Sequence, residues 1–251
     1  CSSNSQIISS TTPSVLSNSE IISEIGADPV LFYDPNVSGS IVGTSVTDQS
    51  STNNDGTLQN GTTTITDGTN TVFSFDGTND YISTTTSYTD PSNVSVVVWF
   101  KTSTSQDGKI IGFEDLQTGT TSSDYDRHLY LGGTNDSLNF GVYGGSTDVA
   151  SNTSVNVIDG NWHFAAGTYS ENDTQLKLYI DGITNVSTAP SSFAQNYTGY
   201  WRIGSYKLDN WPNTSASGYF TGRVGYVQVY HEALTSDQIK VIYDNTRTRF
   251  L

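Results

Sequence analysis

The alternating segment at residues 176–182 (Leu-Lys-Leu-Tyr-Ile-Asp-Gly) constrains the fold of this chain most strongly. Successive side chains of a β-strand point in opposite directions, so its three aliphatic residues would share one face. The Asp-Gly pair that ends it supplies the positive φ angles of a tight hairpin turn. Residues 162–169 are patterned in the same way, and the polar loop 170–174 would join the two strands as a hairpin.

Similar segments recur along most of the chain and are separated by clusters of Gly, Asn and Asp. This regularity predicts an all-β sandwich or barrel. Residues 94–100 are apolar on both faces, which is typical of a central strand covered on both sides. The expected strands cover residues 30–33, 72–75, 81–83, 94–101, 109–113, 128–131, 138–143, 162–169, 176–180, 200–203 and 222–230.

Two segments depart from the strand pattern. Thr235 is a good N-cap, and the residues after it predict one short C-terminal helix. Residues 1–27 are rich in Ser and Thr, with three isolated aliphatic pairs that are too few to form a core. We expect an extended N-terminal arm, ordered by packing on a sheet edge or in a groove of its own or a neighbouring subunit. The β-sandwich domain would then cover residues 28–251.

The charge distribution limits the partners of this protein. Its net charge is −15, and the first 100 residues contain no Lys or Arg. Such a surface repels nucleic-acid phosphates, so we expect no nucleic-acid partner. It favours solubility and attracts divalent cations or basic partners.

The sequence also bears on membranes and on location. No run of about twenty apolar residues exists, which predicts the absence of a membrane span. Cys1, followed by Ser-Ser-Asn-Ser, resembles the mature end of a bacterial lipoprotein and would carry a lipid anchor. Truncation or viral processing would explain this beginning equally well. The expected location is extracellular, at a cell surface or on a virion.

Several motifs occur in an order that resembles a known family. They lie at residues 48–58, 75–82, 94–101, 159–163, 176–182, 201–204, 219–230 and 231–239. Together they resemble the laminin G-like domains of the concanavalin A-like lectin/glucanase superfamily, in their bacterial and phage form. The resemblance covers roughly residues 28–245.

This resemblance implies a two-sheet antiparallel jelly-roll sandwich. Members of the family mostly bind glycans or proteins, on cell surfaces, secreted enzymes or virions, and many carry a structural Ca²⁺. The chain departs from the family pattern at Gly225 and Tyr226, where two acidic residues are usual. This departure argues against a metal site in that strand.

Calcium needs six to eight oxygen ligands, which two clusters of acidic and amide side chains would supply. The alternative is that these side chains only build turns, by bonding to the nearby backbone. The candidate metal ligands are Asp48, Asn54 and Asp55 in one cluster, and Asp76, Asn79 and Asp80 in the other.

Sugar binding needs exposed aromatic rings beside planar polar side chains. Trp211 precedes a proline in a polar segment, so no regular strand would bury it. The alternative is that this loop packs on its own sandwich or on a neighbouring subunit. The candidate ligand-binding residues are Tyr206, Asp209, Asn210, Trp211 and Tyr219, together with Tyr125 and Arg127 from another irregular stretch.

Catalysis finds little support in the sequence. Glucanases of this fold place two carboxylates at alternate positions of one strand, so that both face the same cleft. Glu114 and Asp115 are adjacent and would point to opposite faces, and the three histidines have no zinc spacing.

We therefore predict a non-catalytic surface recognition module that binds a glycan or a surface protein. One alternative is a self-assembling subunit of an appendage or virion, a homo-oligomer that uses residues 1–27 for its contacts. A second alternative is an accessory domain of a glycan-degrading enzyme.

Overall fold

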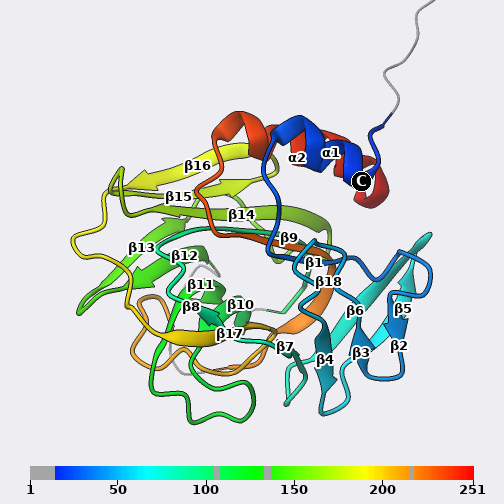
Figure 1. Cartoon of the computed structure of the whole chain (residues 1–251), viewed down its shortest axis with the longest axis horizontal. Helices are drawn as coiled ribbons and strands as arrows, with labels where there is room; N and C mark the ends of the chain where they lie inside the picture. Colours follow the sequence, from blue (N-terminus) through cyan, green and yellow to red (C-terminus); the bar gives the residue numbers. More distant parts are fainter. Residues whose placement is uncertain (1–14, 105–107, 133–136, 215–217) are drawn as a thin grey trace, which may run out of the picture.

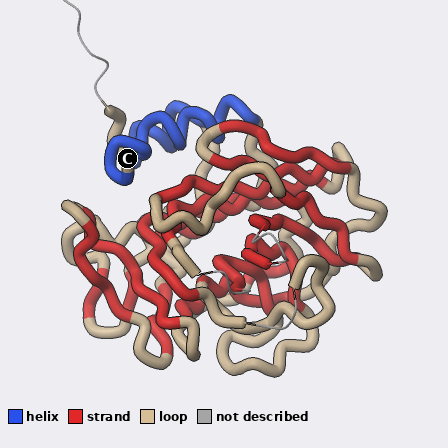
Figure 2. The backbone as a smooth tube through the Cα atoms, turned by 180° about the vertical axis from the view of Figure 1, so that it is seen from behind, coloured by secondary structure: helices blue, strands red, loops and turns tan. Residues whose placement is uncertain are grey.

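The computed structural model describes residues 15–104, 108–132, 137–214 and 218–251. Two antiparallel β-sheets lie against each other as a jelly-roll sandwich. The helices α1 (Asn18–Ile25) and α2 (Ser236–Phe250) lie together on the outer side of one sheet (Figure 1). Seen from behind, the same helix pair forms a separate layer beside the strands (Figure 2).

One sheet has eight strands within the described residues, and the helices cover it. Its central strand is β9, which pairs with β14 and β18 on its two sides, as the apolar pattern of residues 94–100 predicted. In spatial order the strands are β16 (Ile183–Thr188), β15 (Gln175–Ile180), β14 (Trp162–Ser170), β9 (Asn93–Lys101), β18 (Thr221–Tyr230), β6 (Asn70–Asp76) and β5 (Thr63–Asp67), with β1 (Leu31–Tyr33) also paired to β18.

The other sheet has ten strands within the described residues. In spatial order they are β13 (Thr147–Asn152), β12 (Ser137–Tyr143), β11 (Tyr125–Gly132), β10 (Gly108–Glu114), β17 (Thr198–Ile203), β7 (Tyr81–Thr84), β4 (Gly56–Gln59), β3 (Ser45–Val46) and β2 (Ile41–Val42), with β8 (Tyr88–Thr89) also paired to β17.

The core follows from the two-residue period of the strands. In β9, Val96 and Val98 face the second sheet and belong to the core between the sheets. Val97 and Trp99 point the other way, into a second core beneath the helices. The Trp99 indole stacks on the ring of Phe250 in α2, with ring centroids 4.8 Å apart.

All the strands expected from the sequence are present, and the hairpin of β14 and β15 has the predicted pairing. Asp181 and Gly182 both have positive φ, 51° and 77°, as the predicted tight turn requires. The strands that the sequence did not reveal are mostly edge strands or very short ones, such as β13, β16 and β2. An edge strand has fewer buried neighbours, so its apolar alternation is weaker.

The prediction of an extended N-terminal arm is wrong for residues 18–25, which form α1. Ser17 and Glu20 make a reciprocal capping box, and Gly26 ends the helix in the left-handed conformation. The α1 residues Ile21 and Ile25 are buried against the rest of the protein, so this segment packs on its own chain. Residues 1–14, including Cys1 and its expected lipid anchor, lie outside the described residues.

The C-terminal helix α2 begins after the predicted N-cap Thr235 and is longer than the sequence suggested, at 15 residues. Gly225 in β18 makes room for it, because a Cβ atom there would lie 2.4 Å from the Phe250 ring. Neither α1 nor α2 is long and apolar enough to cross a lipid bilayer.

Candidate functional site

Residues 204–214, which follow β17, pack on the outer face of the ten-stranded sheet. Leu208 and Trp211 lie against Tyr130 of β11, on the side away from the sandwich core. The Tyr130 hydroxyl donates to the carbonyl of Pro212 at 2.7 Å. The Asn213 amide donates to Asn139 of β12, at 2.9 Å, which ties the loop to a second strand.

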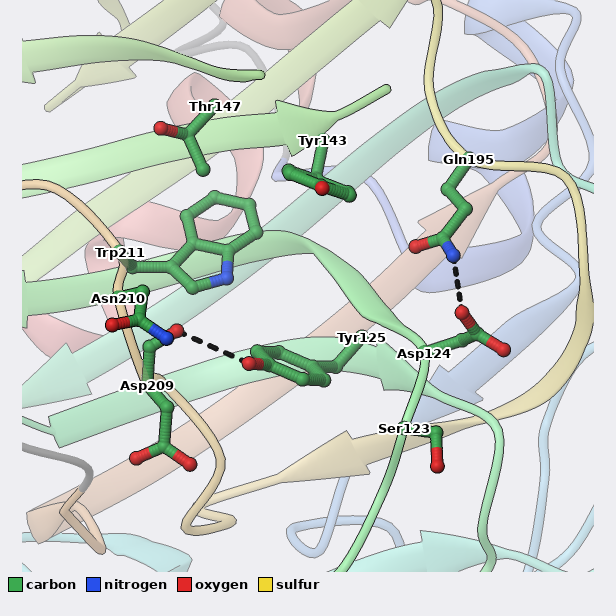
Figure 3. Close-up of a pocket in the computed structure, with 9 residues that line it drawn as sticks. All are labelled: Ser123, Asp124, Tyr125, Tyr143, Thr147, Gln195, Asp209, Asn210 and Trp211. Atoms are coloured by element: carbon green, nitrogen blue, oxygen red, sulfur yellow. Dashed lines mark hydrogen bonds between the residues drawn. The ribbon is translucent and has the colours of Figure 1, made fainter. Parts of the chain in front are cut away.

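This loop closes one side of a pocket of about 360 Å³, which we call the Trp211 pocket. Strands β11, β12 and β13 and the segment around Gln195 supply the other sides (Figure 3). Three aromatic and six polar side chains line it: Tyr125, Tyr143 and Trp211, and Ser123, Asp124, Thr147, Gln195, Asp209 and Asn210.

The aromatic side of the pocket is built on His128. The imidazole ring lies between Tyr125 and Trp211, with ring centroids 6.1 Å and 4.5 Å away. Gly112 and Gly141 make room for this stack. A Cβ atom at Gly112 would lie 2.0 Å from the His128 ring, and one at Gly141 would lie 2.8 Å from the Trp211 ring.

His128 is therefore a neutral packing residue. Burial lowers its pKa well below 6.5, and the nearby charges of Lys109 and Arg127 lower it further. Neither ring nitrogen has a hydrogen-bond partner in the described structure. Trp211 was expected to be exposed, but it is only 4% exposed. The expectation failed because the loop packs on its own sheet.

The polar side of the pocket contains both paired and unpaired groups. The Tyr125 hydroxyl donates to the Asp209 carbonyl at 3.1 Å, and the Gln195 amide donates to the Asp124 carboxylate (Figure 3). The side chains of Asn210 and Tyr143 have no hydrogen-bond partner among the described residues, and both are exposed. These free groups can bond to a ligand.

The predicted ligand-binding residues do not all meet at this pocket. Tyr125, Asp209, Asn210 and Trp211 line it. Tyr206 and Tyr219 instead pack against each other, with ring centroids 5.2 Å apart, in a cluster that includes Tyr81. The sequence thus assigned to one site two groups of residues that lie in separate places in the structure.

The prediction that Arg127 binds a ligand is wrong, because its side chain is fully buried and cannot contact one. Its guanidinium group pairs with Asp126 and donates to the backbone carbonyls of Pro91 and Gln195, at 2.9 and 3.0 Å. It packs over the ring of Phe113. Arg127 thus helps to hold the segment that carries Gln195, one of the pocket residues.

Five pocket residues were missed by the sequence reasoning: Ser123, Asp124, Tyr143, Thr147 and Gln195. Each lies in a turn or at the end of a strand, and no motif marks them. Only Tyr143, at the end of an expected strand and directly before two glycines, gave a local signal of an exposed aromatic side chain.

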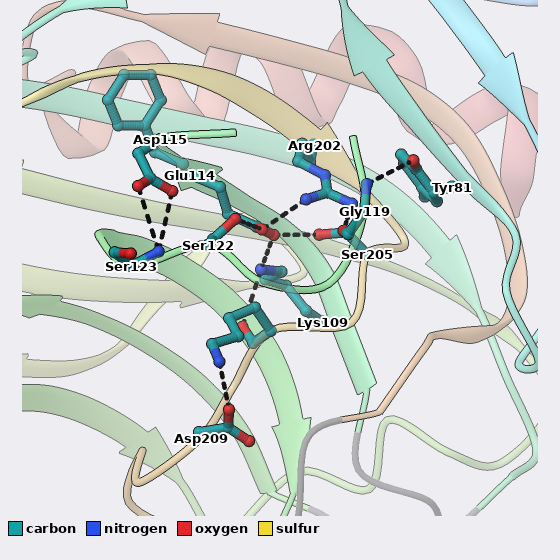
Figure 4. A network of polar contacts seen from close by, with 12 residues as sticks. Tyr81, Lys109, Glu114, Asp115, Gly119, Ser122, Ser123, Arg202, Ser205 and Asp209 are labelled. Atoms are coloured by element: carbon teal, nitrogen blue, oxygen red, sulfur yellow. Dashed lines mark hydrogen bonds and ion pairs between the residues drawn. The ribbon is translucent and has the colours of Figure 1, made fainter. Parts of the chain in front are cut away.

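Beside the pocket, the outer face of the ten-stranded sheet buries a charged cluster (Figure 4). Glu114 pairs with Lys109 and with Arg202, whose guanidinium nitrogen lies 2.6 Å from the carboxylate. The hydroxyls of Ser122 and Ser205 each donate to the same carboxylate at 2.7 Å. We call Lys109, Glu114 and Arg202 the buried charge cluster.

The electrostatics of this cluster follow from its burial. Burial lowers the pKa of Lys109 to about 8, although the Glu114 charge opposes this change. Burial alone would raise the pKa of Glu114, but the charges of Lys109 and Arg202 outweigh it and hold that pKa low. Glu114 is therefore an anion with no exposed oxygen.

The first candidate calcium cluster is a hydrogen-bonded turn. The buried Asp48 carboxylate accepts hydrogen bonds from the backbone of Phe32 and Asn54, at 2.8 and 2.7 Å, and from neighbouring hydroxyls. Asp55 accepts from the backbone of Asp48 at 2.9 Å. The side-chain amide of Asn54 donates to the backbone carbonyl of Thr86 and accepts from the backbone N–H of the same residue. These oxygens already serve N–H and O–H donors.

The second cluster is more open. Asp76 accepts a hydrogen bond from the backbone of Thr78 at 2.7 Å, and Asp80 accepts one from the backbone of Asp76 at 3.1 Å. Burial raises the pKa of Asp80, and the Asp76 charge adds to the effect. The Asn79 carbonyl accepts from Asn60. Among the described residues no three acidic, histidine or cysteine side chains gather as metal ligands. Calcium binding stays a prediction.

Comparison with solved structures finds similar folds in toxin binding domains. The botulinum neurotoxin serotype D ligand binding domain, solved in complex with N-acetylneuraminic acid, is 16% identical with a TM-score of 0.62, covering 89% of this chain and 52% of that chain. The binding domain of Paraclostridial Mosquitocidal Protein 1 is 12% identical with a TM-score of 0.60, covering 86% and 52%. This chain thus spans about half the length of these structures, and such low identities show a shared fold alone.

No curated protein sequence matches this chain significantly. A laminin G family profile, described as the concanavalin A-like lectin/glucanases superfamily, matches residues 76–240. The matched region runs from the end of β6 into α2 and so includes most of both sheets and the Trp211 pocket. The chain belongs to the concanavalin A-like lectin/glucanase superfamily, as a laminin G-like domain.

Proposed function

We propose that this domain binds carbohydrate in the Trp211 pocket. The observation that carries the proposal is one cavity of about 360 Å³ in which six polar side chains meet two partly exposed aromatic rings, Tyr125 and Tyr143, beside the nearly buried Trp211. Sugars present apolar C–H faces that pack on aromatic rings, and hydroxyls that bond to planar polar groups. Asn210 and Tyr143 offer such groups without internal partners.

The comparisons support this proposal by analogy of fold. One of the similar toxin domains was solved in complex with a sugar, N-acetylneuraminic acid. A shared fold does not by itself assign a ligand, so the argument rests on the pocket. Recognition of glycans would place the domain outside the cell or at a surface, where glycans are displayed.

We also propose that the domain binds its ligand without cleaving it. Glycosidases need two carboxyl groups on either side of the scissile bond, one of which donates a proton. Glu114 is buried, has a lowered pKa and accepts hydrogen bonds at both oxygens. Burial raises the pKa of Asp126 to about 6, but this side chain is also enclosed and pairs with Arg127. Neither group can reach a sugar in the pocket, and the two carboxylates that do line it, Asp124 and Asp209, are bonded to Gln195 and Lys207.

A glycan array with purified protein tests the binding proposal. Asn210→Ala should weaken binding by about two- to tenfold, the typical value of one lost hydrogen bond. Asn210 is exposed but has a positive φ of 62°, which alanine disfavours, so the matched control is Asn53→Ala, at an exposed asparagine with a φ of 53° in the turn before β4. Equal binding by wild type and the Asn210 variant, or no binding of any glycan, would refute the proposal.

Trp211→Ala is the stronger test but needs a stability measurement. The indole ring packs on Tyr130 and His128, so its loss would also cost about 3–5 kcal/mol of stability. Loss of binding in a variant that keeps a cooperative thermal transition supports the pocket. The absence of cleavage is checked by incubating any bound glycan with the protein and measuring released reducing sugar.

A further inference from the structure

We infer that the Trp211 pocket selects uncharged sugars and discriminates against sialic acid and other acidic sugars. The inference rests on the proposed function and specifies its ligand class. It departs from what the sialic acid complex of one similar fold suggests, and it follows from the charges and free groups around the pocket.

The charges that line the pocket are negative. Two of its nine lining residues, Asp124 and Asp209, carry carboxylates, and none of the nine is Lys, Arg or His. Anionic ligands would therefore enter against like charges.

The positive charges near the pocket are already engaged, since Lys109 and Arg202 share the Glu114 carboxylate and Arg127 pairs with Asp126. The Lys207 ammonium lies 2.5 Å from the Asp209 carboxylate and 5.1 Å from the centre of the Tyr125 ring. It balances one of the two lining carboxylates. Among the described side chains, only the uncharged amide of Gln195 bonds to Asp124. His128 behind the aromatic rings is neutral, since burial lowers its pKa.

The groups left free for a ligand are uncharged. Asn210 offers an amide, and Tyr143, Thr147 and Ser123 offer hydroxyls that have no hydrogen-bond partner among the described residues. Amides and hydroxyls both donate and accept, which suits the hydroxyl groups of a neutral sugar. Recognition of a carboxylate generally uses Arg or Lys, often in bidentate form, and this pocket presents neither.

The experiment compares glycans that differ only in a terminal sialic acid, such as lactose and sialyllactose, by calorimetry. We expect the neutral member to bind at least about tenfold more tightly at low salt, and the ratio to shrink as salt screens the repulsion. Asp124→Asn should reduce the ratio, because it removes the unbalanced lining carboxylate at nearly constant shape. Asp244→Asn on α2, over the opposite sheet, makes the same charge change and should leave the ratio unaltered.

The outcomes separate this inference from the function beneath it. Equal or tighter binding of the sialylated member, with binding weakened by Asn210→Ala, would overturn the inference and keep the carbohydrate site. An unchanged ratio in Asp124→Asn would also overturn it. If Asp124→Asn fails to fold, Asp209→Asn serves in its place, since it releases the Lys207 ammonium toward the pocket. Binding of neither member, on this pair and across the array, would remove the proposed function itself.

Discussion

Replacing Glu114 with glutamine should destabilise this protein severely, because the substitution leaves Lys109 and Arg202 buried without a counter-charge. Both cationic side chains are fully inaccessible to solvent, and Glu114 is their shared partner. Glutamine keeps the shape of the side chain and can still bond to Ser122 and Ser205. The change therefore isolates the loss of one negative charge.

The magnitude follows from the burial of these groups. The pKa of Lys109 is lowered from 10.5 to about 8 even with Glu114 present, which corresponds to a cost of about 3 kcal/mol for its charged form. Removing one partner of a buried ion pair costs about 3–5 kcal/mol. The free energy of unfolding of a typical domain is about 5–15 kcal/mol, so Glu114→Gln should remove a large part of it.

Urea unfolding at about pH 7 measures the change, with Asp244→Asn as the control for an exposed ion pair that is worth about 0–1 kcal/mol. Lys109→Met combined with Glu114→Gln should be less destabilised than Glu114→Gln alone, because it removes one of the two unbalanced cations. A loss below about 1 kcal/mol for Glu114→Gln would show that water reaches the cluster and would refute the reasoning.

The pH dependence of the same variant gives an independent check. A lysine whose folded-state pKa is depressed releases its proton first in the folded state, so stability rises as pH increases from that pKa toward 10.5. Without Glu114 the folded-state pKa of Lys109 should fall further. The penalty of Glu114→Gln should therefore be largest at neutral pH and smaller at about pH 9.

Three further predictions concern other parts of the molecule. Gly112→Ala should shift the stacked rings of the pocket, because its Cβ would lie 2.0 Å from His128, and near-ultraviolet circular dichroism should change; an unaltered spectrum would contradict the packing. His163 contacts two aspartates at 3.1 and 3.2 Å, and although burial lowers its pKa, these carboxylates outweigh burial and raise it. Its stabilising effect should be complete below about pH 6.5 and disappear as pH rises through the raised value, so His163→Gln should cost on the order of 1 kcal/mol at about pH 5.5 and little at about pH 8.5. Equal losses at both pH values would point to packing alone. Calcium, if it binds at Asp76 and Asp80, should raise the melting midpoint of chelator-treated protein, and an unchanged midpoint would remove the metal.

The sequence predicted the residues of the proposed site only in part. It identified the loop that carries Trp211 and Asn210, because aromatic and amide residues gathered there without a strand pattern. It could not show that Tyr125 meets that loop, since the two contacting residues are 84 positions apart. It also placed Arg127 among the ligand-binding residues, although the side chain turns into the protein at a residue with a positive φ of 53°.

Helix α1 is a second feature that the sequence did not lead us to predict. The capping box of Ser17 and Glu20 and the glycine after residue 25 are local signals that a reading of the sequence could have used to predict α1. The short length and polar composition of the segment concealed it. Isolated helices of this length are marginal in water, so packing of Ile21 and Ile25 on the sheet and on α2 stabilises it.

The strand pattern alone determined an all-β sandwich or barrel, its central strand and the Asp181-Gly182 hairpin, because alternation and turn preferences act within a few residues. The choice of a two-sheet sandwich came from the resemblance of the ordered motifs to a known family. Tertiary structure alone decided which polar groups meet. Glu114 lies at the end of strand β10, yet its charge is balanced by Arg202, which is 88 residues away in the sequence. Directions of side chains are local properties of the backbone, whereas pockets and buried ion pairs depend on which strands become neighbours. The strand pattern therefore predicts the scaffold, and the pairing of distant strands creates the site.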